Sequence, residues 1–191
     1  MMPSRLRQKL QAFARNETGA VVAEAVIILP LFIWAYIGLY AYWDAFRSNN
    51  AMQKAAFTVS DMLSREQVEI TSGYVDGLQL VVDYLIDEDQ TARIRLTSIT
   101  FDGTDQAFKV HWSASPGGTM SPLTTDSLQA FANLIPDMSP GDYAIVLEVE
   151  ADYEPNFDVG LPDQTFREFV VTRPRFAPCL RLAGSATCSG A

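Results

Sequence analysis

The sequence predicts an α+β fold, in which one long N-terminal helix precedes a small antiparallel sheet of about four strands and two shorter helices. Three observations support this fold class. Residues 19–43 form one apolar run with a single charge, Glu24. Residues 44–64 lack Gly and Pro and keep apolar residues at spacings of three and four, which favours a continuing helix. After residue 92 the apolar period changes to two, which is typical of strands.

The apolar run is long enough to cross a membrane, because roughly 20 helical residues span a hydrocarbon core of about 30 Å. A membrane helix tolerates its Pro30. Tyr40 and Trp43 suit the far membrane–water interface. A cleaved secretory signal is the alternative. Such a signal has an apolar core of about 7–15 residues and a small-residue cleavage site, whereas this run is longer and ends in residues 41–44, AYWD. The pattern therefore favours a membrane anchor.

Charge predicts the orientation of this anchor and the division of the chain. The residues before it carry four basic side chains, Arg5, Arg7, Lys9 and Arg15, against one acidic one, Glu17. Basic flanks stay in the cytoplasm. We expect a cytoplasmic leader over residues 1–19, a membrane-spanning helix with an outer extension over residues 20–65, and an outer α+β domain over residues 66–191. The chain has a net charge of −9, which gives it no electrostatic reason to bind nucleic acid.

Turn residues and apolar periods place the elements of the outer domain. They are a helix over about 74–88, a hairpin of 93–101 with 106–114, a short helix over about 125–135, a strand over 143–153 and a last strand over 166–172. The apolar positions of the first strand change parity near Thr97 and Ser98, which we attribute to a bulge there. Residues 44–63 could also form a coiled-coil seam, although the stripe is short.

The strand over 143–153 has the clearest alternation in the chain. Its odd-numbered positions are apolar or aromatic, and Glu148, Glu150 and Asp152 lie between them. This pattern predicts one buried and one solvated face, as in an antiparallel sheet with helices on a single side. We therefore expect one core.

Cys179 and Cys188 are the two cysteines of the chain, and they lie close together near its end. Outside the cytoplasm such a pair is normally oxidised. We expect a disulfide that restricts an otherwise loose tail, with two unrelated thiols as the alternative. Metal binding is a poorer interpretation, because no further Cys pair or nearby His completes a site.

No catalytic or metal-binding motif is evident in the sequence. His111 is the only histidine, and no nucleophile motif accompanies it, so we expect an ordinary core or surface residue. The acidic residues 87–89 are interpreted as a solvated helix end. Asp102 and Asp105 lack the spacing of a calcium loop. The chain is therefore expected not to be an enzyme, and to need neither cofactor nor metal.

Glu24 needs a specific explanation, because a carboxylate about one turn inside hydrocarbon costs roughly 2–3 kcal/mol and is a functional residue by default. One explanation is that it lies close enough to the cytoplasmic edge to reach water. Another comes from its context: Gly19 ends the short basic leader, and Glu24 follows five residues later. This arrangement resembles the processing site of type IV pilin-like proteins, and with Pro30 the run most resembles the TadE/TadG-like proteins of the tight-adherence pilus system.

The resemblance implies how this region would function. A prepilin peptidase would cut between Gly19 and Ala20, and Glu24 would set the register between neighbouring subunits. The segment Tyr153-Glu154-Pro155 is also similar to a late strand of that family. The resemblance further implies a pseudopilin-like head, the bacterial inner membrane with the head in the periplasm, and other pilus subunits or assembly proteins as partners in cell adhesion.

Two departures refine the resemblance. Residue 25 is Ala, where the major pilin of that system usually has Tyr, and the chain is much longer than a major subunit. Both favour a minor pseudopilin, and cleavage after Gly19 is a hypothesis. The alternative function is a membrane-anchored periplasmic binding or sensor domain without catalytic activity.

Overall fold

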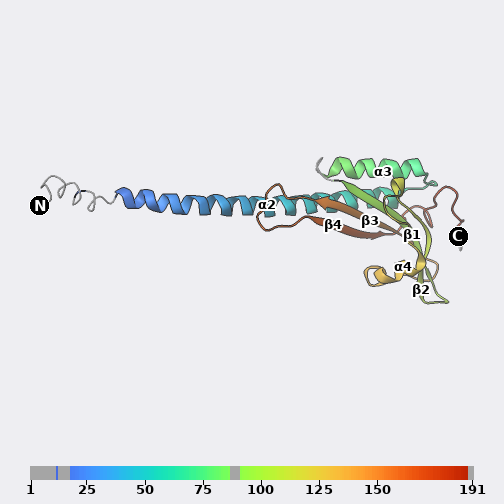
Figure 1. The fold of residues 1–191 in the computed structure, drawn as a ribbon. Coiled ribbons are helices and arrows are strands. Elements are labelled where there is room, and N and C mark those ends of the chain that lie inside the picture. Colours follow the sequence, from blue (N-terminus) through green and yellow to red (C-terminus); the bar gives the residue numbers. More distant parts are fainter. Residues whose placement is uncertain (1–11, 13–17, 87–90, 189–191) are drawn as a thin grey trace, which may run out of the picture. The chain divides into compact units, whose positions relative to one another are not determined.

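A computed structural model describes residue 12 and residues 18–86 and 91–188, and it has the expected α+β architecture (Figure 1). The described chain divides into two compact units. One contains α2 up to Trp43 together with residues 156–161. The other contains Asp44–Pro155 and the chain from Pro162 onward. The expected helix over residues 20–65 therefore contributes its second part, from Asp44, to the same unit as the sheet.

Helix α2 spans Thr18–Arg65 and contains Pro30, which confirms the long N-terminal helix. Its two parts differ in burial. Large apolar side chains between Val21 and Trp43 are mostly exposed, whereas Met52, Val59 and Leu63 are fully buried. Ala55 and Ala56 complete the buried stripe. Phe57 and Met62 belong to the apolar residues of the 44–64 segment, but both are exposed and lie outside the buried face of the helix.

Two further helices follow, as expected. Helix α3, Ser72–Leu85, begins at Thr71, whose side chain accepts a hydrogen bond from the Tyr74 N–H. Its expected range was 74–88, and the acidic residues 87–89 lie outside the described residues. The short helix expected over 125–135 is one turn of α-helix, α4 (Thr125–Leu128), that continues as the 3₁₀ segment η2 (Gln129–Leu134). Thr124 and Ser127 form a capping box at its start.

The sheet has four antiparallel strands in the order β2-β1-β3-β4. Their bounds agree closely with those expected from the sequence. They are β1 Ala92–Asp102, β2 Ala107–Ala114, β3 Tyr143–Tyr153 and β4 Gln164–Thr172. The turn between β1 and β2 packs against the turn before β3, where a Cβ on Gly103 would come within 2.8 Å of Pro140. Glycine is therefore required at this close approach.

The bulge expected in the first strand is not in β1, which pairs with β3 without interruption from Ala92 to Thr100, and the extra residue of the hairpin lies in β2. The apolar positions of β1 change parity because Leu96 and Ile99 face different apolar clusters. Ser98 pairs with Trp112 and Ile99 pairs with Val110, so His111 has no opposite residue in β1. The bulge reverses the alternation of β2. Trp112 consequently belongs to one apolar cluster, and Val110 packs against the other, although their numbers have the same parity.

The expectation of one core and one solvated sheet face was wrong. The larger cluster lies between the sheet and α2 and α3, and it includes Leu96 and Leu147. The smaller cluster lies on the opposite face and includes Ile99, Val146 and Leu128 of α4. Neighbouring residues of a strand point to opposite faces, and most of β3 is buried on both. The reason is that α4 and η2 fold back over part of the face that carries Glu148, Glu150 and Asp152.

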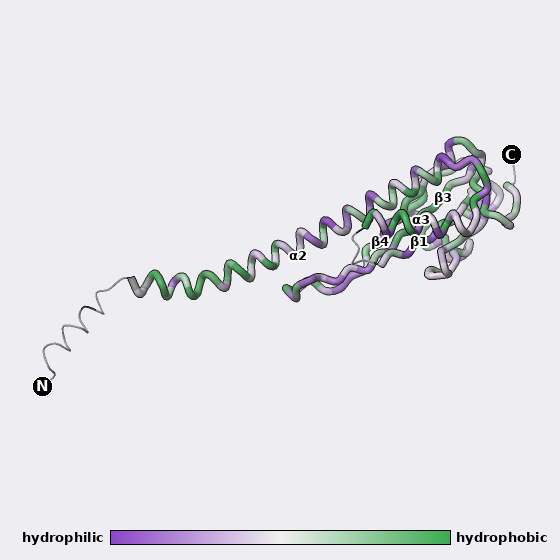
Figure 2. The backbone as a smooth tube through the Cα atoms, turned by 90° about the horizontal axis from the view of Figure 1, so that it is seen from above, coloured by the Kyte–Doolittle hydropathy of each residue, from purple (hydrophilic) through white to green (hydrophobic). Residues whose placement is uncertain are grey.

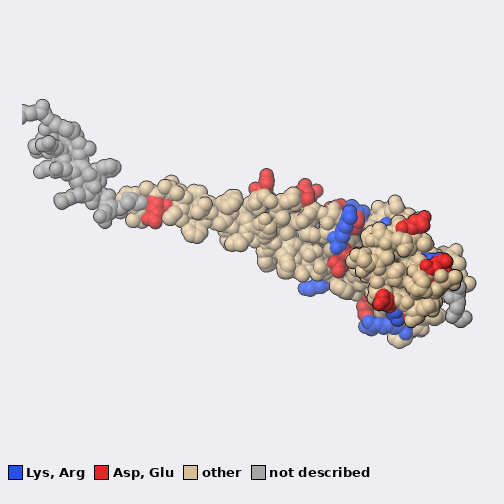
Figure 3. Space-filling view, turned by 90° about the horizontal axis from the view of Figure 1, so that it is seen from below, with Lys and Arg blue, Asp and Glu red and all other residues tan. Residues whose placement is uncertain are grey.

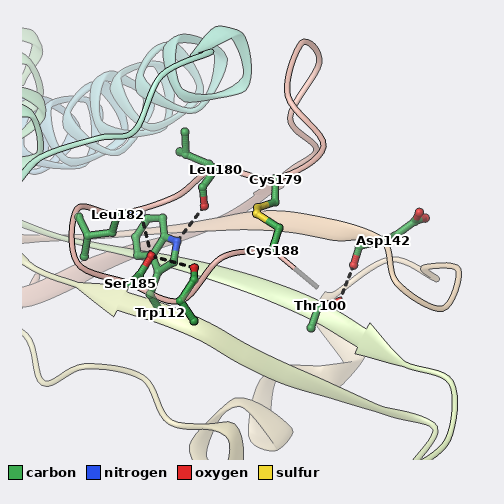
Figure 4. Close-up of a disulfide and its surroundings, with 9 residues drawn as sticks. Thr100, Trp112, Asp142, Cys179, Leu180, Leu182, Ser185 and Cys188 are labelled. Atoms are coloured by element: carbon green, nitrogen blue, oxygen red, sulfur yellow. Dashed lines mark hydrogen bonds between the residues drawn. A yellow bond between two sulfur atoms is a disulfide. The ribbon is translucent and has the colours of Figure 1, made fainter. Parts of the chain in front are cut away.

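The C-terminal segment is attached to the domain by more than its disulfide. Cys179 and Cys188 are bonded, with their Cα atoms 6.4 Å apart. Leu180 is buried, and its carbonyl accepts a hydrogen bond from Trp112 Nε1 at 2.8 Å (Figure 4). The Ile70 N–H donates to the Arg181 carbonyl at 2.9 Å, and Ile70 and Leu182 form an isolated parallel bridge. The tail expected to be loose therefore closes one end of the larger core.

Candidate processing site and membrane anchor

The first part of α2 has the length and composition of a membrane span. Its most apolar stretch has none of its residues buried within the protein, and it includes Ile27 at 74% and Phe32 at 68% exposure. Figure 2 shows this stretch as almost continuously hydrophobic, and in Figure 3 its surface is uncharged except for acidic atoms near its start. Exposed apolar surface of this extent is not stable in water. A lipid environment satisfies it, while the helix satisfies its own backbone hydrogen bonds.

Gly19, Ala20 and Glu24 all lie in the first turns of α2, which begins at Thr18. The peptide bond between Gly19 and Ala20 is therefore helical in the intact chain. The Gly19 Cα faces open space, with nothing within 4 Å of an added Cβ. The fold thus gives no steric reason for glycine at position 19. The basic residues expected to form the cytoplasmic leader lie outside the described residues.

Glu24 is exposed on one apolar face of α2. The same face carries Val21, Ala25, Ile28 and Leu29, whose spacing of three and four residues brings them together around a shallow groove. Within the part of the chain that the structure describes, the Glu24 carboxylate has no ion-pair partner. A carboxylate that no described residue neutralises is costly in hydrocarbon and can accept a cation from another group.

The start of the second unit has a polar contact between α2 and the end of β3. The Tyr153 hydroxyl donates a hydrogen bond to Asp44 Oδ2 at 3.0 Å. Tyr153 is the first residue of the segment noted for its resemblance to a late strand of the pilus family. Tyr153 is the last residue of β3 and contacts α2 through Asp44. Glu154 and Pro155 begin the following loop.

A cleft of about 390 Å³ lies on the sheet face partly covered by η2. Phe131 of η2 stacks on Phe169 of β4 at its edge, with ring centroids 5.5 Å apart. Of the five charged side chains that line the cleft, all but Glu168 are paired with one another. Arg95 makes two hydrogen bonds of 2.7 and 2.6 Å to Glu148, and Arg167 Nε lies 3.1 Å from Glu150 Oε1. The cleft therefore offers apolar contact and exposed rims, but no activated nucleophile or base.

The other residues considered in the sequence as possible catalytic or metal-binding groups, His111, Asp102 and Asp105, contact neighbouring side chains of the same domain. The His111 ring packs edge-on against Tyr143, with centroids 5.6 Å apart, and sits at the bulge. Asp102 and Asp105 both bind the Lys109 ammonium. Lys109 and the Thr104 N–H lower the pKa of Asp102 to about 2, and the bond to Asp102 raises the pKa of Lys109 to about 12. Among the described residues, no three His, Cys, Asp or Glu side chains are grouped as metal ligands.

One contact was not expected from the sequence. Phe157, in the loop between β3 and β4, packs edge-on against Tyr40 of α2, with ring centroids 6.1 Å apart. The available signal was the alternation of Phe157, Val159 and Leu161 within a loop otherwise rich in polar residues, Gly and Pro.

Comparisons of the chain with protein-family models, with curated proteins and with solved structures give no match.

Proposed function

We propose that this chain is a minor pseudopilin, a structural and assembly component of a bacterial tight-adherence pilus. In this proposal α2 crosses the inner membrane with its N-terminus in the cytoplasm, and the α+β domain lies in the periplasm. The observation that carries the proposal is Glu24: one carboxylate, five residues after Gly19, on the exposed apolar face of a helix that continues into a folded domain.

The proposed chemistry begins with hydrolysis of the peptide bond between Gly19 and Ala20 by a prepilin peptidase. Water is consumed, Gly19 keeps the new carboxylate with the removed leader, and Ala20 becomes an α-ammonium group. In a bundle of such helices within the membrane, the ammonium of one subunit can pair with Glu24 of its neighbour. Either charge alone would be costly in hydrocarbon, so the pair fixes the axial register of the two helices.

The first experiment determines the N-terminus of the protein extracted from its native membranes, by intact mass and N-terminal sequencing. A chain that begins at Ala20, and is full length when the peptidase is absent, is the expected result. Gly19→Leu serves as the matched variant. Because position 19 faces open space, leucine fits the helix, and a persistent full-length product would reflect peptidase recognition. A full-length chain in the wild type would contradict processing.

The second experiment tests Glu24 by itself. Glu24→Gln keeps the size of the side chain and removes its charge, so we expect normal membrane insertion and normal cleavage but loss of the protein from sheared pili. Glu24→Asp keeps the charge and is the control that should retain most incorporation. Pili that contain the Gln variant at wild-type level would refute the role in register.

A binding or sensor domain is the second candidate, and the cleft between η2 and the sheet favours it. Its volume is in the range of small-molecule sites, and its stacked Phe131 and Phe169 offer an apolar wall. A full-length N-terminus in native membranes, together with a ligand-dependent rise in melting temperature that Phe131→Ala abolishes, would support this function over the first.

A further inference from the structure

The loop between β3 and β4 has an unusual composition for an exposed connection. It carries Phe157, Val159 and Leu161 at every second position, and Figure 2 shows apolar residues at its tip. The Val159 N–H donates to the Phe157 carbonyl at 3.0 Å, and Gly160 has a φ of +90°, which turns the chain back. Residues 156–161 belong to the same compact unit as the first part of α2.

The contact with α2 leaves much of both rings uncovered. Phe157 remains 46% exposed and Tyr40 40% exposed, although their centroids are only 6.1 Å apart. Tyr42 and Trp43 are each 58% exposed. Tyr40 also packs at 6.2 Å from Trp43. Aromatic rings from the loop and the helix thus form one partly uncovered cluster.

The position of this cluster along α2 coincides with an expected membrane boundary. A helix rises about 1.5 Å per residue, so the segment from Ala20 to Tyr40 covers about 30 Å, the thickness of a hydrocarbon core. If the span begins where the apolar run begins, Tyr40 and Trp43 lie at the opposite membrane–water interface, where Tyr and Trp are enriched. Phe157 contacts Tyr40, so the loop tip lies at the same level.

We propose that residues 156–161 form a second membrane contact, in which the Phe157 ring inserts at the boundary between phospholipid headgroups and acyl chains, beside Tyr40 and Trp43. The occupant of this surface is the lipid interface, because the cluster is continuous with the membrane-spanning part of α2. Apolar burial supplies the attraction. Residues 156–161 contain Asp158 and no Lys or Arg, so attraction to anionic lipid does not contribute. This proposal rests on α2 crossing the membrane and not on a role in a pilus.

The test uses the full chain in its native membrane, with the photoreactive analogue p-benzoyl-phenylalanine at position 157. Illumination inserts the benzophenone into a nearby C–H bond, and intact mass identifies what was captured. Position 176 is the matched control, because Phe176 is also an exposed phenylalanine, at 64%, and it lies in the other unit. An intact disulfide and an unchanged circular dichroism spectrum verify the fold of both proteins.

The expected result is an added mass of one phospholipid at position 157 and none at position 176. Capture of a protein at position 157, equal lipid capture at both positions, or no capture at position 157 would each overturn the proposal. The outcome is separable from the pilus role: lipid capture in a chain that keeps its full N-terminus would support the membrane contact and count against processing.

Discussion

Lys109 shows how single side chains stabilise the hairpin turn between β1 and β2. Its ammonium binds the carboxylates of Asp102 and Asp105, and the Thr104 N–H also donates to Asp102 at 2.7 Å. The two pKa values move in opposite directions, to about 2 for Asp102 and to about 12 for Lys109. Both groups are fully charged near neutral pH, so the two carboxylates of the turn, which lack the spacing of a calcium loop, share the positive charge of one lysine.

Lys109→Met should raise the pKa of Asp102 from about 2 toward its ordinary value of 3.8. The rise is partial because the backbone donor at Thr104 remains. Nuclear magnetic resonance titration of the Asp102 carboxyl carbon measures it. Lys54→Met is the control, since Lys54 is exposed on α2 and takes no part in this turn. An Asp102 pKa that stays near 2 in the Lys109 variant would show that the backbone donor is sufficient.

The same two pKa values determine how the free energy of unfolding changes with pH. The folded pKa of Asp102 lies below 3.8, so its stabilising contribution is complete above that pH and is lost as the pH falls toward 2. The folded pKa of Lys109 lies above 10.5, so its contribution is complete below that pH and is lost as the pH rises through about 12. We expect the difference in stability between the wild type and the Lys109 variant to shrink at both extremes, which unfolding measurements across pH can follow.

At the scale of the sheet, two cross-strand Arg–Glu ion pairs differ in how far they are exposed to solvent. Arg95 and Glu148 pair directly between β1 and β3, and their side chains are only 13% and 8% exposed. Arg167 and Glu150 pair between β3 and β4, and Arg167 is 73% exposed. Arg95 also donates to the Ser121 carbonyl at 2.6 Å, which fixes the segment before α4 over the sheet.

Arg95→Met should therefore cost about 3 kcal/mol or more of unfolding free energy, because it leaves the nearly buried Glu148 carboxylate without its partner. Arg167→Met is the matched control and should cost less than about 1 kcal/mol, since water already screens that pair. Denaturant unfolding of both variants in the same detergent measures the difference. Equal costs would mean that Glu148 finds compensation elsewhere.

The elements themselves were largely predictable. β3 occupies Tyr143–Tyr153 as expected, and α2 ends at Arg65, because long periodic segments carry strong local signals. The second core was missed although its signal was present. Ala144 and Val146 make one end of the supposedly solvated face apolar, and only Glu148 and the acidic residues after it are charged. Whether α4 covers that end depends on tertiary packing, which periodicity does not report.

The sequence indicates candidate site residues only where they lie close together along the chain. Gly19 and Glu24 lie within one short stretch, so their spacing can be recognised directly. The contact between Phe157 and Tyr40 joins a late loop to an early helix, and no local pattern specifies that pairing. The bulge shows a related limit: the parity change between Leu96 and Ile99 reflects burial on both faces of β1, and the extra residue, His111, lies in β2.

At the scale of the whole molecule, the division of α2 between two units has a testable consequence. The buried stripe of α2 begins beyond Asp44, and Met52, Val59 and Leu63 are all fully buried in the larger core. Full burial of side chains of this size contributes about 1.5–3 kcal/mol each. Their sum is a large part of the 5–15 kcal/mol that typically stabilises a domain.

A chain that starts at Asp44 should therefore be soluble and unfold cooperatively, with its disulfide formed. A chain that starts at Gln67 should fail to fold, because it lacks one wall of the core. Circular dichroism and calorimetry of the two fragments distinguish these outcomes. A folded fragment from Gln67 onward would show that the sheet and α3 are sufficient without α2.

His111, which has no opposite residue in β1, also determines which sequence changes the hairpin can accept. The residues of β2 before and after it are out of phase, so Phe108 and Val110 pack against one core while Trp112 lies in the other. Replacing His111 alters one ring and leaves this phase intact. Deleting residue 111, or inserting a residue beside it, would move the side chains on one side of the bulge to the opposite face of the sheet. In related chains, the length of β2 should therefore vary less than its composition.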